Sequence, residues 1–385
     1  MGASVFSRAV RQLAWLGGCS GLVLAIGAAA VPSSPVGSVS GFAGELRGVA
    51  VVSGADAWAV GDAPTSSGGS RALVLHWNGT RWTKVASPAP GINSLLSGVS
   101  AISPSDVWAV GSFSTSTAGG KTLVLHWNGI RWTRVPSPTP EAVDGSFLQG
   151  VSALSPSDVW AAGFVFGTGG ESSNTLVLHW NGVRWTRVTS PNPSAGSFNE
   201  LLGVSGSSAR DVWASGDFLT TSGGQRTLLL HWNGARWARV ASPNQAANGF
   251  FNAVSDRSVS DAWAAGEFSK SLIAHWNGSQ WESVANPGPS GSALNGISAR
   301  STSDAWTVGS VLLNGGKSGT LILRWNGTKW ARVASENPGG VNGTTLSAVA
   351  TLSGSDAWAV GSFVSSTSQQ RVLILHWNGS RWLRS

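Results

Sequence analysis

The sequence is poor in residue types that covalent stabilisation and several kinds of catalysis need. Among its 385 residues there is no Tyr, one Cys (Cys19), one Met and only 11% charged side chains. A single Cys excludes a disulfide within the chain, so the fold must be stabilised by its core. The absence of Tyr excludes a tyrosine nucleophile. The 51 Gly and 16 Pro are typical of a chain with many short strands and tight turns.

A pair of motifs recurs seven times, with a period of 43 to 53 residues. In the second copy the motifs read SDVWAVG over 105–111 and LVLHWNGIRW over 123–132. Each copy contains three Trp, which together make up 21 of the 22 in the chain. The first Trp of each copy are Trp58, Trp108, Trp160, Trp213, Trp263, Trp306 and Trp358, and the second are Trp77, Trp127, Trp180, Trp232, Trp276, Trp325 and Trp377. This period predicts a repeat architecture.

Each copy predicts four short strands. In the second copy we expect strands over 96–102, 107–113, 122–127 and 131–135. Asn128-Gly129 favours a two-residue type I′ hairpin turn between the last two strands. The strands are apolar on both faces, as expected for sheets packed between two neighbours. Four antiparallel strands repeated seven times predict an all-β fold, a seven-bladed β-propeller.

The N-terminal residues have the features of a secretory signal. Arg8 and Arg11 precede an apolar run over 13–30, which ends in an Ala-Ala-Ala cleavage site. The alternative is an uncleaved membrane anchor, because the apolar run approaches spanning length. We therefore expect a signal or anchor over 1–30, a Pro/Ser/Gly linker over 31–43 and the propeller over 44–385. This organisation predicts an extracellular or cell-surface protein.

The charge pattern bears on the class of partner. The formal net charge is +7, and two of these charges, Arg8 and Arg11, lie in the leader. The other cations are spread over all repeats, whereas a nucleic-acid-binding protein needs a basic stripe, so we expect no nucleic-acid partner. We expect a monomer without membrane insertion beyond the N-terminal segment.

Two polar residue types repeat with the Trp. An Asp precedes the first Trp in all copies (Asp56, Asp106, Asp158, Asp211, Asp261, Asp304 and Asp356), and a His precedes the second in six (His76, His126, His179, His231, His275 and His376), with Arg324 in the sixth copy. Because a catalytic carboxylate is needed once or twice, seven copies favour turn caps that accept backbone N–H bonds. One His per blade cannot converge on one ion, so the repeated Asp, His and Trp are expected to form structural hydrogen-bond networks, as they do in WD-type propellers. No catalytic residue, metal site or cofactor is predicted.

The third Trp of each copy follows the second by five residues and lies across the hairpin from it. We expect these Trp to pack in the core between neighbouring blades. The alternative is that some lie in a shallow pocket between blades and form a platform on which a sugar ring stacks. The candidate ligand-binding residues are therefore Trp82, Trp132, Trp185, Trp237, Trp281, Trp330 and Trp382.

The loops divide between two faces of the expected propeller. The turn before the Asp and the Asn-Gly hairpin share one face and are nearly constant, while the loops on the other face vary, which is where binding usually occurs. In the fifth copy the first two Trp are 13 residues apart, against 19 or 20 elsewhere. This shortening predicts a notch on the variable face, which is either a ligand site or a tolerated deletion.

The repeat resembles known propeller families. The hairpin over 125–133 resembles a degenerate Asp-box, the S-x-D-x-G-x-T-W hairpin of sialidase-type propellers and photosystem assembly factors, with Asn128 at the Asp position. The DVWAVG and HWNGxxW motifs also resemble seven-bladed fucose lectins, tectonin-like proteins and, most closely, bacterial secreted propellers with D-V-W-A-V-G repeats. The resemblance covers 44–385 and implies the fold. Sialidases use a Tyr nucleophile, and galactose-oxidase-like propellers a Tyr–Cys cofactor, so those activities are not expected.

These observations favour an exported, non-enzymatic binding propeller for glycans or cell-surface proteins. The alternative is a polysaccharide lyase or hydrolase with its site on the variable face. The acids that support this alternative are Glu141, Asp144, Glu171, Glu200 and Glu267.

Overall fold

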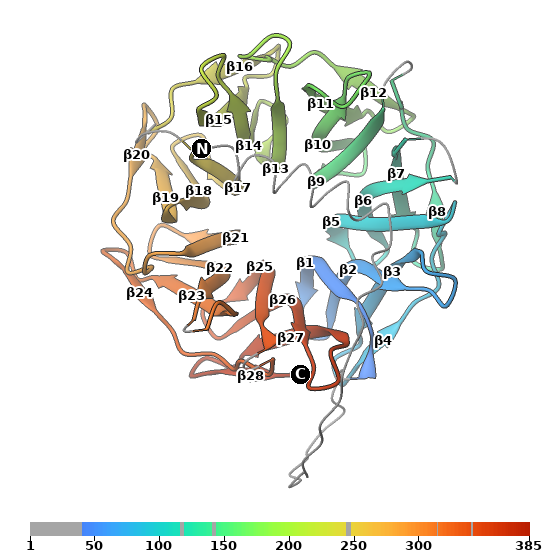
Figure 1. Ribbon diagram of the computed structural model, residues 1–385, viewed down its shortest axis with the longest axis vertical. Helices are drawn as coiled ribbons and strands as arrows, with labels where there is room; N and C mark the ends of the chain where they lie inside the picture. The colour runs from blue at the N-terminus through green and yellow to red at the C-terminus, as the bar shows by residue number, and fades with distance from the viewer. Residues whose placement is uncertain (1–40, 116–118, 141–143, 244–247, 314, 340–341) are drawn as a thin grey trace, which may run out of the picture.

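The computed structural model describes residues 41–115, 119–140, 144–243, 248–313, 315–339 and 342–385. The predicted signal or anchor and most of the linker lie outside these residues. The described chain is all-β, and its sheets are arranged one after another around a central axis in the ring of a β-propeller (Figure 1). No helix in the described ranges has the length and apolar character needed to cross a membrane.

In the described residues, 28 strands form seven antiparallel units of four, here called blades one to seven. The innermost strands are β1 (Glu45–Ser53), β5 (Asn93–Ser103), β9 (Gly145–Ser155), β13 (Asn199–Ser208), β17 (Phe250–Ser258), β21 (Ser292–Ser301) and β25 (Thr344–Ser353). The second strands are β2 (Asp56–Pro64), β6 (Asp106–Ser114), β10 (Asp158–Phe166), β14 (Asp211–Leu219), β18 (Asp261–Phe268), β22 (Asp304–Leu312) and β26 (Asp356–Val364).

The third strands are β3 (Ser70–Trp77), β7 (Lys121–Trp127), β11 (Ser173–Trp180), β15 (Gln225–Trp232), β19 (Lys270–Trp276), β23 (Ser318–Trp325) and β27 (Gln370–Trp377). The outermost strands are β4 (Trp82–Lys84), β8 (Trp132–Arg134), β12 (Trp185–Val188), β16 (Trp237–Val240), β20 (Trp281–Ser283), β24 (Trp330–Arg332) and β28 (Trp382–Arg384). A single parallel bridge between Ser70 and Asn93 joins blades one and two into one eight-stranded sheet.

The Gly of the DVWAVG motif is required by a bulge in the innermost strand. In blade two the register shifts between Leu96 and Gly98, opposite Gly111. A Cβ on Gly111 would lie 2.1 Å from the Leu95 carbonyl oxygen, and the equivalent Gly in the other blades are equally close to their inner strands, at 1.9–2.0 Å. No side chain fits at that separation, which explains why this position is Gly in every copy.

The hairpin turn differs from the predicted type I′ turn. Trp127 pairs directly with Trp132, so the loop contains the four residues 128–131 rather than two. Gly129 has a φ of +88°, but Asn128 is not in the left-handed region. Instead, Asn128 Oδ1 accepts hydrogen bonds from the backbone N–H groups of Ile130 and Arg131, both at 3.0 Å. The Asn therefore closes the turn with its side chain, which is the usual chemistry of an Asx turn.

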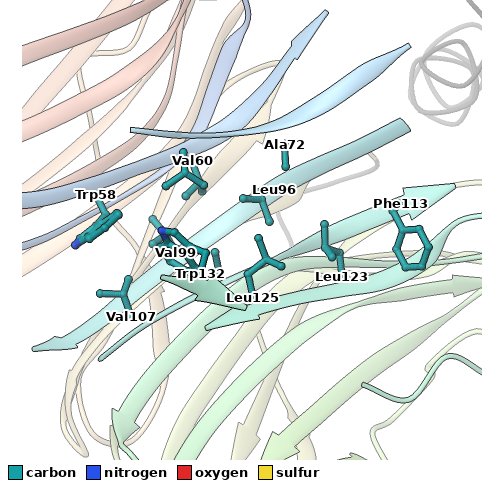
Figure 2. Close-up of a cluster of buried hydrophobic side chains, with 12 residues drawn as sticks. Trp58, Val60, Ala72, Leu96, Val99, Val107, Phe113, Leu123, Leu125 and Trp132 are labelled. Carbon is teal, nitrogen blue, oxygen red and sulfur yellow. The ribbon is translucent and has the colours of Figure 1, made fainter. Parts of the chain in front are cut away.

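The hydrophobic core is divided into seven clusters, each shared by two adjacent blades. Figure 2 shows one of them, in which Trp58 and Val60 of blade one pack with Leu96, Leu125 and Trp132 of blade two. Strands that are apolar on both faces are explained by this arrangement, because each blade is covered on both sides.

The ring closes between blades one and seven, and in the described residues each of these blades is built from four strands that are consecutive in the chain. Trp358 of blade seven packs with Leu46 and Trp82 of blade one in the same kind of cluster. In addition, the Val372 N–H donates to the Phe42 carbonyl and the Gly44 N–H to the Gln370 carbonyl, both at 3.1 Å. Blades one and seven are therefore joined by side-chain packing together with this short backbone contact.

Hydrogen bonds between innermost strands connect five of the seven blade junctions. At each, a Ser Oγ accepts the backbone N–H of a residue in the next blade, at 2.9–3.2 Å. The Ser acceptors are Ser100, Ser152, Ser205, Ser255 and Ser298. Ala50 and Ala350 occupy the same register position opposite the first Trp of blades one and seven, so both junctions of blade one lack this bond.

Candidate functional site

The repeated Asp, His and first Trp form one structural unit in each blade. In blade two, His126 Nε2 lies 2.8 Å from Asp106 Oδ1, and its ring packs on Trp108 with centroids 4.3 Å apart. Across the six blades that have His, the His–Asp distance is 2.7–3.0 Å. In blade six Arg324 replaces the His, with its Nε 3.1 Å from Asp304 Oδ1. The polar residues of the repeat are therefore used to position one another.

The predicted role of the Asp as a backbone turn cap is wrong in detail. In blade two the turn is capped by Ser103, whose Oγ accepts the Ser105 N–H at 3.3 Å. Asp106 is the first residue of β6, opposite the end of β7, so its carboxylate meets the His126 ring instead. Within the described ranges, no three His, Cys, Asp or Glu side chains gather where they could hold a metal ion.

The third Trp of each repeat is buried at a blade junction. Trp132 is 4% exposed and meets Trp58 of the preceding blade edge-on, with centroids 5.3 Å apart and planes at 81°. The same contact recurs at all seven junctions, with centroids 5.0–5.5 Å apart. The seven residues (Trp82, Trp132, Trp185, Trp237, Trp281, Trp330 and Trp382) are 3–6% exposed and lie in different blades. Their role in ligand binding stays a prediction.

A hollow of about 780 Å³ lies on the variable face, over blades one and two. It is lined by Gly44, Asp62, Pro64, Thr65, Ser66, Ser67, Gly68, Gly69, Ser70, Arg71, Ala89, Gly91, Ile92, Asn93 and Gln370. Most of these residues are small or polar, and Ile92 is an apolar side chain that is 55% exposed. The hollow thus combines apolar contact, hydrogen-bonding groups and one cation, Arg71.

Internal hydrogen bonds order the walls of the hollow. Asn93 Oδ1 accepts the Ser70 N–H at 3.0 Å, and Thr65 Oγ1 accepts the Gly69 N–H at 3.0 Å. Asp62 is buried, and burial raises the pKa of its carboxyl to about 6, although Arg47 Nε at 3.2 Å opposes that shift. The loops around the hollow are therefore shaped before any ligand binds.

The shortened loop of blade five does not form this hollow. β18 ends at Phe268 and β19 begins at Lys270, so Ser269 alone connects them, with a φ of +50°. The Ser269 carbonyl accepts the Gly291 N–H at 3.0 Å, which ties the turn to the connection between blades five and six. None of these residues lines the hollow.

The structure brings together only some of the acidic residues on which the alternative enzyme hypothesis depends. Glu141 lies outside the described residues. Asp144 and Glu171 are exposed in neighbouring loops of blade three. A Cβ added at Gly170, next to Glu171, would lie 4.0 Å from Asp144 Oδ2. Glu200 and Glu267 are half-buried in blades four and five. None of the acids lines the hollow.

The sequence did not single out the hollow. Its lining residues come from the start of blade one, from β2, β3 and the loop between them, from the connection between blades one and two with the start of β5, and from blade seven. Arg71 lies in β3, and neither it nor Ile92 and Asn93 belongs to a repeated motif. Their grouping depends on the neighbouring positions of blades one, two and seven in the ring.

No family model matches the chain, and no curated protein matches it. Among solved structures the chain is similar to YCF48 bound to D1 peptide, with a TM-score of 0.53, 12% identity, and 90% of this chain and 96% of that chain covered. It is also similar to the β-propeller domain of the Trilobed protease from Pyrococcus furiosus, which is described as having an open velcro topology. The TM-score is 0.53 at 8% identity, and 89% of this chain and 97% of that chain are covered.

A fucose-specific lectin from Aleuria aurantia is also similar, with a TM-score of 0.47, 12% identity and coverage of 78% and 97%. At these identities the similarity to YCF48 and to the protease propeller shows the fold alone, and the chain is a β-propeller.

Proposed function

We propose that this protein is a non-enzymatic binding propeller that recognises a glycan in the hollow over blades one and two. The hollow is the observation that carries this proposal. Ligand sites are concave, are formed before the ligand arrives and place a few polar groups beside apolar surface. Ile92, Arg71 and Asn93 supply these elements in a hollow of about 780 Å³.

The structural use of the repeated residues supports a binding role over catalysis. In each Asp–His pair the two side chains contact one another, as Asp106 and His126 do, and each third Trp is buried. What differs between blades is the variable face, where a propeller presents different loops on a constant scaffold. The similar propeller YCF48, which has been determined with a D1 peptide, makes a peptide ligand the sibling hypothesis.

A glycan array with the purified protein tests the proposal. We expect binding of a defined set of sugars, and expect Ile92→Ser and Arg71→Ala to weaken it about tenfold or more. Lys121→Ala is the matched control, because Lys121 occupies the position of Arg71 in blade two but does not line the hollow. No binding to any sugar or cell-wall polymer, or equal losses in all three variants, would contradict the proposal.

We also propose that the protein acts outside the cell or at its surface, because residues 1–30 combine two Arg, an apolar run and an Ala-rich cleavage site. N-terminal sequencing of protein recovered from medium and from membranes distinguishes cleavage near Val31 from a retained anchor. Recovery of the intact chain in the cytosol alone would contradict export.

The second hypothesis is a polysaccharide lyase or hydrolase, favoured by the proximity of Asp144 to the Glu171 loop. Incubation with acidic and neutral polysaccharides, followed by chromatography, measures chain cleavage. Cleavage that is lost in Asp144→Asn would support this hypothesis over simple binding.

A further inference from the structure

Two cations recur on the outer edge of six blades. One is the hairpin residue directly before the third Trp, and the other lies two residues after that Trp. These rim cations are Arg81, Lys84, Arg131, Arg134, Arg184, Arg187, Arg236, Arg239, Lys329, Arg332, Arg381 and Arg384. They are 12 of the 25 Lys and Arg of the chain. Blade five has Gln280 and Ser283 at the two positions.

The fold arranges the rim cations around the ring. In blade two, Arg131 lies in the hairpin loop and Arg134 in β8, an outermost strand whose ladder partner is β7 (Figure 1). Eleven of the twelve are exposed, and Arg384 is half-buried. The rim cations, which recur about once per repeat in the sequence, therefore form a belt of positive charge over the contiguous blades six, seven, one, two, three and four. The sequence reading of scattered cations missed this belt.

The charge of the belt is available to a partner. In the part of the chain that the structure describes, no ion pair joins a rim cation to a carboxylate. The repeated Asp, which could have neutralised the belt, is engaged with the His of its own blade, as in the Asp106–His126 pair.

Aromatic contacts hold some of these cations in place. The Arg134 guanidinium lies 4.4 Å from the centre of the Phe113 ring. Arg239 over Phe218 and Arg384 over Phe363 repeat the contact at 4.6 Å. Such stacking reduces the freedom of a long side chain and leaves its N–H groups able to bind an anion.

From this geometry we infer that the rim cations bind a linear acidic glycan, a polysaccharide with regularly spaced carboxylate or sulfate groups, along the circumference of the ring. A flexible polyanion can follow several blades, whereas a flat surface meets only part of a curved rim. Single-stranded nucleic acid would need exposed aromatic platforms for its bases. The aromatic residues between the rim cations, such as Trp132, are buried.

This surface is separate from the hollow, since no rim cation lines it. Loss of the rim interaction therefore leaves binding of a neutral sugar in the hollow unchanged, and the two proposals fail independently.

The test measures binding to polygalacturonate, to uncharged dextran of matched length and to single-stranded DNA at increasing NaCl. We expect polygalacturonate to bind and to weaken steeply with salt, and dextran not to bind to the rim. The rim variant is Arg131→Gln/Arg134→Ser/Arg184→Gln/Arg187→Ser. It gives blades two and three the Gln and Ser that blade five has at the two rim positions. We expect it to weaken polygalacturonate binding about tenfold or more, because four exposed ion contacts are lost.

The matched control removes four cations of the variable face that do not line the hollow: Lys121→Gln, Lys270→Gln and Lys317→Gln, which are exposed, and Arg226→Gln, which is half-buried. It has the same net charge as the rim variant and should retain most of the binding. If the rim variant unfolds, Gln280→Arg/Ser283→Arg extends the belt through blade five and should tighten binding. Equal losses in both four-site variants, tighter binding of DNA than of polygalacturonate, or no binding at low salt would overturn the proposal.

Discussion

Trp132 packs edge-on against Trp58 of the preceding blade, with ring centroids 5.3 Å apart. Since every third Trp makes this contact, we expect Trp132→Ala and Trp237→Ala each to lower stability by about 3–5 kcal/mol. Thermal melting measures the loss. Ile130→Ala, at a side chain that is 82% exposed, is the control and should melt like the parent protein. Unchanged melting of Trp132→Ala together with lost glycan binding would instead make the third Trp a ligand platform.

Blade one is expected to be the least firmly bonded blade at the inner ring. The Ser298 Oγ accepts the Thr351 N–H at 3.2 Å between blades six and seven, but Ala350 and Ala50 lack a hydroxyl. We expect Ser298→Ala to lower stability by about 1 kcal/mol, and Ala50→Ser and Ala350→Ser each to raise it by a similar amount. Melting curves of the three variants, with Ser66→Ala as an exposed control, test this expectation. A loss of stability in both Ala→Ser variants would show that the missing bonds do not weaken the ring.

The Asp–His unit is expected to accept Arg but not a small side chain. His126→Ala would remove both the contact with Trp108 and the hydrogen bond to Asp106, at a cost of about 1–3 kcal/mol. His126→Arg should cost less, because Arg324 already binds Asp304 and lies over Trp306 at 4.9 Å in blade six. Denaturant unfolding ranks the two variants. Equal losses would mean that the His ring has a role that a guanidinium cannot fill.

Asp256 makes stability depend on pH. Burial raises the pKa of its carboxyl to about 8, and the charge of Asp211 adds to that shift. Its unfolded pKa is about 3.9, so between about pH 4 and pH 8 the folded state binds more protons than the unfolded state, and the stability contributed by this group falls as pH rises. The Tm of the Asp256→Asn variant, relative to that of the parent protein, should therefore increase with pH, by a few degrees between pH 5 and pH 9.

Melting of the Asp256→Asn variant and the parent protein at each pH measures this difference, and other titrating groups cancel in the comparison. The Ser207 N–H donates to Asp256 Oδ2 at 2.8 Å, and Asn retains an oxygen for that bond. A Tm difference that is constant from pH 5 to pH 9 would contradict the raised pKa.

The sequence by itself determined the repeating unit and the all-β class. The spacing of three Trp and one Asp recurs in each copy, with a His in six of them, and short apolar β-prone runs bounded by turn residues predict four strands without knowledge of any distant contact. The strands expected in the second copy agree with β5 to β8 to within a few residues. The Gly of DVWAVG was visible as a constant feature, although its reason, the closeness of Gly111 to the Leu95 carbonyl, was not.

Only the tertiary structure decided what the repeated and the scattered residues do. The Asp106 carboxylate had two possible partners in sequence, its own turn and the His 20 residues later, and strand register selects the His. Ile92 joins Arg71 and Gln370 around one hollow because the loops of three blades meet there. The rim cations form a belt because the blades that carry them are neighbours in a closed ring. These properties depend on contacts between residues far apart in the chain, which local sequence patterns do not specify.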